Sequence, residues 1–424
     1  MSFQTGLSGL NASARNLDVI GNNIANANTT GMKSSRAEFS GLVSSALSSA
    51  SSGGSGIGVE VANVSQQVTQ GNISTTNNNL DVAVNGSGFF QLTQNDGSPA
   101  YTRDGSFKLD KDGFLRTNAG ANLMGYPTDI AGNTTSVSLQ KLQLPTNAPI
   151  AASATTTVSA EFNLDARAKG PAATLADGKP PVARSTYGTS LNVYDAQGVA
   201  STANFYFVKT DTANEWQVFD SLNVAATPIT SLTFNNNGNP IAPTSTIATG
   251  PNAGKFGVAL PTTTFATSNP NDLDGVLDGP LDIVFESVTQ FGTSFAVSNL
   301  TQDGYTAGEL TGLNIGDDGI ITARYSNGET QSAGKIALAD FRNIQGLVPM
   351  GGNAWAATSE SGLPVQGAPG EGKFGILRAG ALEESNVDLT AELVNMMTAQ
   401  RAYQANAQTI KTQDQVLQTL VNLR

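Results

Sequence analysis

Carboxylates are the side chains of this sequence best suited to chemistry, because the chain contains no histidine and no cysteine. The commonest general base and the commonest transition-metal ligand are therefore missing. The acidic stretch Asp110-Lys111-Asp112-Gly113 resembles the start of a calcium loop, but its glycine comes too early and no glutamate closes the loop. A β-turn explains it better, as it does Asp317-Asp318-Gly319. We therefore predict no enzymatic activity, no cofactor and no metal site.

The composition is typical of a secreted, turn-rich β protein. Only 13% of the 424 residues are charged and 7% are aromatic, while 45 are glycine. The net charge of -12 argues against a nucleic-acid or anionic-membrane partner, and no apolar run is long enough for membrane insertion. No cation or continuous apolar region opens the chain, so a cleavable signal peptide is not expected. The glycines between Gly53 and Gly58 neither follow a predicted strand nor open a helix, which argues against a phosphate-binding loop.

The last stretch, 389–424, carries apolar or small residues at alternating steps of four and three. This spacing predicts a heptad helix that packs against another helix. A second apolar set, which includes Val394, Met397 and Val416, lies off this seam, so another part of the chain or other copies must cover it. The seam positions are Leu389, Leu393, Met396, Gln400, Tyr403, Ala407, Ile410, Asp414, Leu417 and Val421.

The N-terminus has the same heptad spacing and almost no charge. Only Arg15 and Asp18 are charged before Asn26, and the polar stretch Asn26 to Gly31 should end the helix. We predict that the two terminal helices pack on each other and on neighbouring copies, although the spacing alone also allows a pair within one chain. The N-terminal seam is Phe3, Leu7, Leu10, Ala14, Leu17, Gly21 and Ile24.

Between the helices the hydrophobic period changes to two. The segment from Phe39 to Gly58 is rich in Ser, Gly and Ala and predicts a linker, or a segment that is ordered only by contacts with neighbouring copies. Short strands separated by turn signals then continue to about Ser385, where a capping pattern opens the last helix. The expected fold class is multidomain, with mainly β outer domains and with N- and C-terminal α-helices that form a coiled-coil-like inner domain. Four parts are expected: a terminal helical domain (1–28 plus 388–424), an extended linker region (29–70 plus 365–387), a β-rich middle domain (71–145 plus 281–364) and an inserted outer β domain (146–280).

The polar end of the first helix carries a long motif, from Leu17 to Lys33. It resembles the N-terminal motif of bacterial flagellar axial proteins, the family of rod and hook subunits, with Met32 in place of the usual aromatic residue. The resemblance continues in 70–73, 80–90, 101–107, 352–358 and 379–389, and in the closing helix. The motif positions are Asn22, Asn23, Asn26, Asn28, Thr29, Gly31 and Lys33 near the start of the chain, and Ser385, Asn386, Val387 and Asp388 near its end.

The matching regions leave out the insert, and both the insert and the overall length look like those of hook subunits of this family. This resemblance implies a structural subunit that assembles with itself into a bendable helical tube, transmits torque from rod to filament and encloses the export channel. It also implies an extracellular place in the flagellum and, as partners, the distal rod, the hook cap, the hook–filament junction proteins and the flagellar type III export apparatus. The alternatives are a distal rod subunit and, in another class, a secreted β-rich adhesin.

Overall fold

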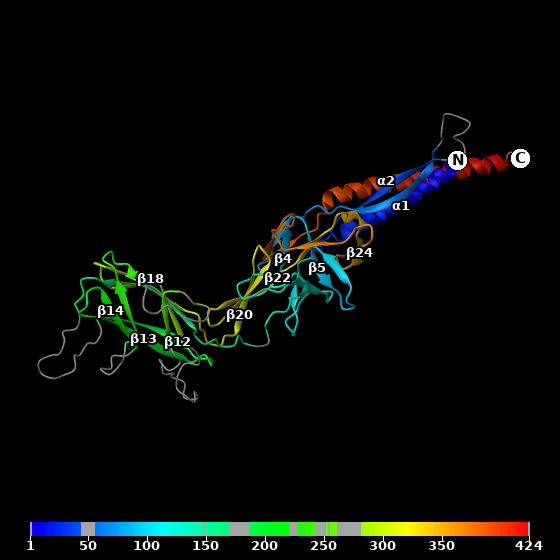
Figure 1. The fold of residues 1–424 in the computed structure, drawn as a ribbon. Helices are drawn as coiled ribbons and strands as arrows, with labels where there is room; N and C mark the ends of the chain where they lie inside the picture. Colours follow the sequence, from blue (N-terminus) through cyan, green and yellow to red (C-terminus); the bar gives the residue numbers. More distant parts are fainter. Residues whose placement is uncertain are drawn as a thin grey trace. The chain divides into compact units, whose positions relative to one another are not determined.

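The protein was analysed as a computed structural model, which describes residues 2–43, 56–146, 149–169, 186–220, 228–241, 247, 252, 255–260 and 281–422. Figure 1 shows the chain, which divides into two compact units. The terminal unit comprises Met1–Asn147, Thr311–Arg324 and Thr330–Arg424, and the inserted unit comprises Ala148–Leu310 and Tyr325–Glu329. In the part of the chain that is described, no helix is long and apolar enough to cross a membrane.

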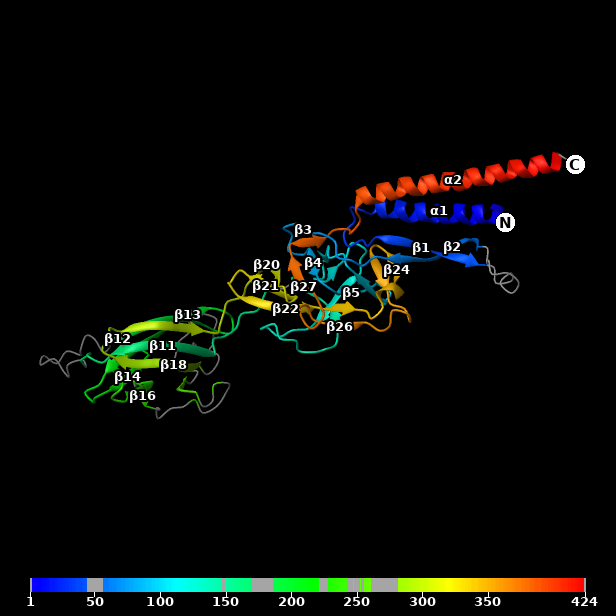
Figure 2. The ribbon, with the colours of Figure 1, turned by 90° about the horizontal axis from the view of Figure 1, so that it is seen from above.

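The terminal unit begins and ends with the two predicted helices, α1 (Ser2–Ala25) and α2 (Leu389–Asn422). Helix α1 lies between α2 and an antiparallel hairpin of β1 (Ser35–Val43) and β2 (Gly56–Gln66) (Figure 2). The hairpin corrects the linker prediction for Phe39–Val43 and for Gly56–Gly58. Both strands of the hairpin contact α1, which supplies the support that a two-stranded sheet needs. Residues 44–55 of the predicted linker lie outside the described residues.

The β part of the terminal unit is built by both halves of the chain. Its largest sheet has thirteen strands, and two small sheets pair β27 with β4 and β28 with β3. One core surrounds Phe90, Leu123 and Leu338, and a smaller one surrounds Phe89 and Trp355. The strands are β3 (Ile73–Thr75), β4 (Val82–Asn85), β5 (Phe89–Thr93), β6 (Pro99–Thr102), β7 (Lys108–Leu109), β8 (Leu115–Arg116), β9 (Asn122–Tyr126), β10 (Gln140–Lys141), β20 (Leu310–Ile315), β21 (Ile320–Tyr325), β22 (Thr330–Ile336), β23 (Leu338–Asp340), β24 (Val348–Gly351), β25 (Ala354–Ala356), β26 (Val365–Gly367), β27 (Ile376–Ala379) and β28 (Ala381–Glu383), with one 3-10 turn, η2 (Ile344–Gly346).

The inserted unit packs a four-stranded sheet against a five-stranded one. The first has the order β17-β18-β11-β19, and the second is a meander that runs from β12 to β16 in sequence order. Aromatic side chains from both sheets, among them Phe162, Phe207 and Phe285, fill the core between them. The strands are β11 (Thr157–Asp165), β12 (Tyr187–Tyr194), β13 (Ala200–Lys209), β14 (Glu215–Phe219), β15 (Thr230–Phe234), β16 (Pro240–Ile241), β17 (Gly257–Leu260), β18 (Leu281–Phe291) and β19 (Ala296–Gln302).

The extent of the inserted unit differs from the expected one. Strand β18 pairs in parallel with β11, and β19 pairs with the other edge of β11, so residues 281–310 belong to the inserted unit and not to the middle domain. The boundary expected after residue 280 therefore moves to residue 310. A parallel pairing between strands more than a hundred residues apart leaves no mark in the local hydrophobic period, which is why the pattern placed the boundary too early.

Candidate assembly site

Small residues of α1 make its contact with α2. A side chain on Gly6 would meet Ile410 at 3.2 Å, and one on Gly9 would meet Asn406 at 3.0 Å. The Asn406 amide also donates a hydrogen bond to the Ser13 hydroxyl, at 3.3 Å. The two helices therefore run antiparallel and approach closely, along a line that is not the predicted apolar seam of α1.

The predicted seam of α1 lies beside this contact. Leu7 is 45% exposed, and Leu10, Leu17 and Ile24 are half-buried. The side of α1 that faces the hairpin is different again, since the Ser8 hydroxyl accepts a hydrogen bond from the Val59 backbone at 3.2 Å. The apolar stripe of α1 is thus left partly uncovered within one chain. The side chain of Phe3, another seam residue, lies outside what the structure describes.

Helix α2 exposes still more apolar surface. Met396 and Ile410 are half-buried, and both belong to the predicted seam. Leu393 is 50% exposed and Leu417 is 54% exposed, although each has a side chain that water disfavours. The other exposed apolar residues of α2 are Leu389, Val394, Met397, Tyr403 and Val416, while the side chain of Val421 is not described. A large apolar surface of this kind on a soluble protein marks a site of interaction.

Polar side chains hold the base of the helices to the β part. The Asn23 amide donates to the Ser35 carbonyl at 2.8 Å, and its oxygen accepts from the Ser35 backbone at 2.9 Å. The Asn386 oxygen accepts from the Ser34 backbone at 2.8 Å, while its amide donates to the Gln67 carbonyl at 2.7 Å. We call this region the junction, and it comprises residue 23, residues 31–35, residues 67–72, residue 103 and residues 383–388.

Three buried charges lie at the centre of the junction. The Glu383 carboxylate pairs through one oxygen with Lys33, at 2.5 Å, and through the other with Arg103, at 3.2 Å. The Gly71 backbone donates to the first oxygen at 2.9 Å, and the Lys33 ammonium donates to the Thr69 carbonyl at 2.8 Å. Burial lowers the pKa of Lys33, and the hydrogen bond and charge of Glu383 oppose that shift. Burial likewise lowers the pKa of Arg103, again against the effect of Glu383.

Steric constraints explain why the motif has a glycine at residue 31. Gly31 has a φ of 69°, and a side chain there would lie 2.5 Å from the backbone nitrogen of Asp104. Its own backbone donates to the Glu383 carbonyl at 2.8 Å. A glycine is therefore required, because both the left-handed backbone and the close approach exclude a larger residue.

The remaining motif residues finish the helix ends. The Asn26 amide donates to the Asn22 carbonyl at 2.9 Å, and the Thr29 hydroxyl donates to the Asn26 carbonyl at 2.8 Å, so each adds a second hydrogen bond to a carbonyl at the end of α1 that already accepts from a backbone amide. The Asp388 carboxylate accepts hydrogen bonds from the Thr390 and Ala391 backbones, at 2.9 and 3.2 Å, which makes it the N-cap of α2.

Three motif residues have smaller parts in this arrangement. The Ser385 hydroxyl accepts a hydrogen bond from the Val387 backbone at 3.3 Å. Asn28 is exposed, and with Val387 it lines an open groove beside the start of α2. The structure therefore gathers most motif residues into one region but leaves Asn28 at its surface.

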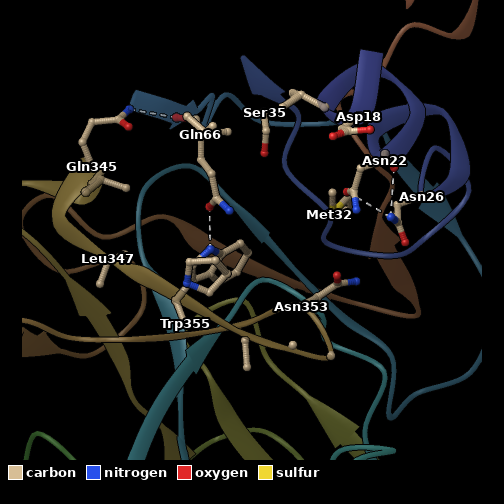
Figure 3. Close-up of a pocket in the computed structure, with 17 residues that line it drawn as sticks. Asp18, Asn22, Asn26, Met32, Ser35, Gln66, Gln345, Leu347, Asn353 and Trp355 are labelled. Atoms are coloured by element: carbon tan, nitrogen blue, oxygen red, sulfur yellow. Dashed lines mark hydrogen bonds between the residues drawn. The ribbon is translucent and has the colours of Figure 1, made fainter. Parts of the chain in front are cut away.

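A groove of about 570 Å³ runs beside α1 (Figure 3). Asp18, Asn22 and Asn26 line it on the α1 side, and the β24–β25 hairpin lines it on the other. At its base the Trp355 indole donates to the side-chain oxygen of Gln66, at 2.6 Å. Above this tryptophan the groove is open and contains few charges.

Sequence reasoning missed several residues of this region, notably Glu383 and Arg103 in the junction and Gln66 in the groove. Glu383 and Arg103 lie within segments that resemble the family, 379–389 and 101–107, which was the available signal. Neither was singled out, because the sequence does not show that a glutamate and an arginine 280 residues apart meet in a buried pair.

Comparison with protein families finds four matching stretches. They are a flagella basal body rod protein domain over residues 3–33, the D1 domain of flagellar hook protein FlgE/F/G over 83–160, the FlaE D2 domain of a flagellar basal body protein over 163–305, and the C-terminal domain of flagellar basal body rod FlgEFG proteins over 378–423. The terminal helices and the inserted unit thus each match a separate family domain.

Full-length relatives match the whole chain. Flagellar hook protein FlgE of Escherichia coli is 42% identical over 435 residues, and that of Salmonella typhimurium is 42% identical over 433, each covering all of both chains. FlgE of Treponema pallidum is 34% identical over 471 residues, with all of this chain and 99% of the relative covered. The crystal structure of Helicobacter pylori flagellar hook protein FlgE2 covers 73% of this chain and 100% of that chain, with a TM-score of 0.50 and 15% identity, which is a likeness of fold.

Proposed function

This chain belongs to the flagellar hook protein family and is a structural subunit of the bacterial flagellar hook, and we propose that its terminal helices are the surfaces through which copies assemble. Family membership implies polymerisation with further copies and a place in the flagellum. The finer architecture below is our proposal for how this chain carries out that function.

The observation that carries the proposal is the exposed apolar surface of the helices. Leu393 and Leu417 are each about half exposed on α2, and Leu7 is similarly exposed on α1. The contacts within one chain leave these side chains about half exposed, whereas packing between copies would bury them and contribute about 25 cal/mol for each Å² covered. In this proposal the two predicted seams pack in a coiled-coil-like manner between neighbouring copies.

A tube follows from contacts that do not close. A head-to-tail contact between identical copies produces an open helical polymer, unless its rotation brings the chain of copies back to the start. We place the terminal helices (1–28 plus 388–424) innermost around the channel. The linker segments (29–70 plus 365–387) and the β parts lie outside them, with the inserted unit outermost.

Bending and torque place different demands on these layers. The inner helices keep their register through apolar packing, while the Thr-, Asn- and Gly-rich outer parts slide on weaker, hydrated contacts. The polymer would then transmit torque from rod to filament while it bends. Its further partners would be the distal rod, the hook cap, the hook–filament junction proteins and the flagellar type III export apparatus.

The test is to place charges on the exposed seam of α2. The variant Leu393→Asp/Leu417→Asp leaves the single chain folded, since both positions are half exposed, but it should abolish polymer formation. The matched control is Val137→Asp, which makes the same type of change at a site that is 90% exposed in the β part. Electron microscopy should show tubes for the native chain and the control only, with circular dichroism confirming equal helix content. Tubes from the double variant at native yield would refute the proposal.

A further inference from the structure

A six-stranded part of the large sheet ends in two open edges, β24 and β26. Its strands follow one another in the order β24-β25-β6-β5-β23-β26. Among the residues that the structure describes, no further strand pairs with the outer side of either edge. Both edge strands are short, and Pro349 in β24 has no backbone N–H to donate. Such edges are poor templates for a strand of another chain, so any contact there depends on side chains.

Apolar side chains are exposed at both of these edges. Val348 and Met350 on β24 are 52% and 47% exposed, and Val365 on β26 is 61% exposed. Leu363, which comes just before β26, is 89% exposed. The register of the six strands places Val348 and Val365 on the same face of the sheet. The sheet therefore leaves apolar groups in water at each of its two ends.

The loop that presents Leu363 is held in place by its own hydrogen bonds. The Thr358 hydroxyl donates to the Gly346 carbonyl at 2.6 Å, and the Ser361 hydroxyl accepts from the Thr358 backbone at 2.9 Å. Ser361 itself is buried. Because the loop is already fixed, a contact through Leu363 loses little conformational entropy.

The segment that forms both edges is nearly uncharged. Glu360 is the only charged residue between Asn343 and Gly370. The whole chain has a net charge of -12, so identical copies repel one another over most of their surface. Copies of this chain can approach most closely where charge is absent, and the two edges meet that condition.

We propose that the β24 edge of one copy packs against the β26 edge of the next copy in the polymer. Two different edges of one chain make a heterologous contact, which repeats from copy to copy in an open polymer. Four side chains bury much less than the roughly 1,000 Å² that a stable interface between free proteins needs. The contact therefore forms between copies that the terminal helices already hold close together. This inference rests on the proposed function and adds a second contact, in the β part.

Charges placed on the two edges test the contact in the polymer. Val365→Lys and Val348→Glu each put one charge into an apolar contact, so each should raise the critical concentration for tube formation about ten-fold. In Val348→Glu/Val365→Lys, the introduced cation of one copy faces the introduced carboxylate of the next. The critical concentration should then return to within about three-fold of the native value. Within one copy the two positions are five strand spacings apart, about 24 Å, so the rescue arises between copies.

The matched control is Val137→Lys, which changes a residue that is 90% exposed and lies on neither edge strand. It should polymerise at the native critical concentration. Urea denaturation of the monomers should show equal stability for all variants, because each substituted side chain is at least half exposed. Added salt should weaken the rescue in the double variant, since it screens the new charge pair.

Two outcomes would overturn the contact. One is a native critical concentration in both Val348→Glu and Val365→Lys. The other is a double variant that polymerises no better than the weaker single variant. The proposed role of the helices is tested independently, because the edge variants should still form tubes above their raised critical concentration. Leu393→Asp/Leu417→Asp, by contrast, should form none at the same concentrations.

Discussion

In the junction, Lys33 and Glu383 are buried and paired with each other, whereas along α2 the apolar side chains of Leu393 and Leu417 remain about half exposed. One region places charges where water is excluded and satisfies them within the chain. The other leaves apolar side chains exposed to water, so folding of the single chain does not obtain the stabilisation that their burial would provide. The polar groups of the junction are thus satisfied within one chain, while in our proposal the apolar faces of the helices are covered by other copies.

The largest expected effect comes from filling a site of the junction that is both tight and left-handed in its backbone. Gly31→Ala places a methyl group against the Asp104 backbone in a left-handed conformation, and it should destabilise the terminal unit by more than about 3 kcal/mol. Gly21→Ala is the control, because no atom lies within 4 Å of the added methyl group. It should stabilise α1 by about 0.5 to 1 kcal/mol. Urea denaturation of both variants measures the change in the free energy of unfolding. Equal changes for the two variants would contradict the claim that the junction is tightly packed at Gly31.

A smaller effect is expected where α2 leaves the junction. Asp388→Ala removes the N-cap that accepts from Thr390 and Ala391, at a cost of about 1 kcal/mol. The loss should be seen as faster exchange of those two amides. Thr412→Ala, in the exposed middle of the same helix, should slightly favour the helix, since its hydroxyl only bonds back to the Thr409 carbonyl. Unchanged exchange in Asp388→Ala would show that the junction holds the start of α2 without its cap.

The smallest effect is a dependence on pH that only the charged region should show. Burial lowers the pKa of Lys33 below its ordinary value of 10.5, so the unfolded chain binds more protons than the folded chain between the two values. Stability should therefore rise with pH in that window. Lys33→Met should remove this rise, which denaturation at several alkaline pH values would detect. Measurements should stay below about pH 10, because burial raises the pKa of Tyr101 and ionisation of that tyrosine acts in the opposite direction.

The sequence predicted the terminal helices well because their signals are local. The heptad spacing and the break at Asn26 predicted α1, which ends at Ala25, and the capping pattern predicted α2, which begins at Leu389. The contact line between them was not predicted. It passes through Gly6 and Gly9, and an apolar period cannot indicate contacts made by residues that lack side chains.

The local hydrophobic pattern of the sequence did not predict features that depend on pairing between distant segments. The Ser- and Gly-rich composition around β1 favoured a linker, but support from α1 lets those residues form a hairpin. Strand β18 was predicted to lie in the middle domain, but it pairs with β11 and so belongs to the inserted unit. The buried group of Lys33, Arg103 and Glu383 likewise requires a fold to bring it together. The family resemblance identified Lys33 as important, and the structure supplies the physical reason.

Burial of the α2 seam in the polymer is the most direct test of the account. The chain contains no cysteine, so a single Leu393→Cys or Val137→Cys substitution provides a unique thiol. Reaction of each thiol with a maleimide should be compared in the monomer and in the polymer. The account predicts that the thiol at 393 reacts at least about ten-fold more slowly in the polymer because packing excludes water there, while the thiol at 137 reacts equally in both. Equal reactivity of the thiol at 393 in both states would contradict assembly through the exposed face of α2.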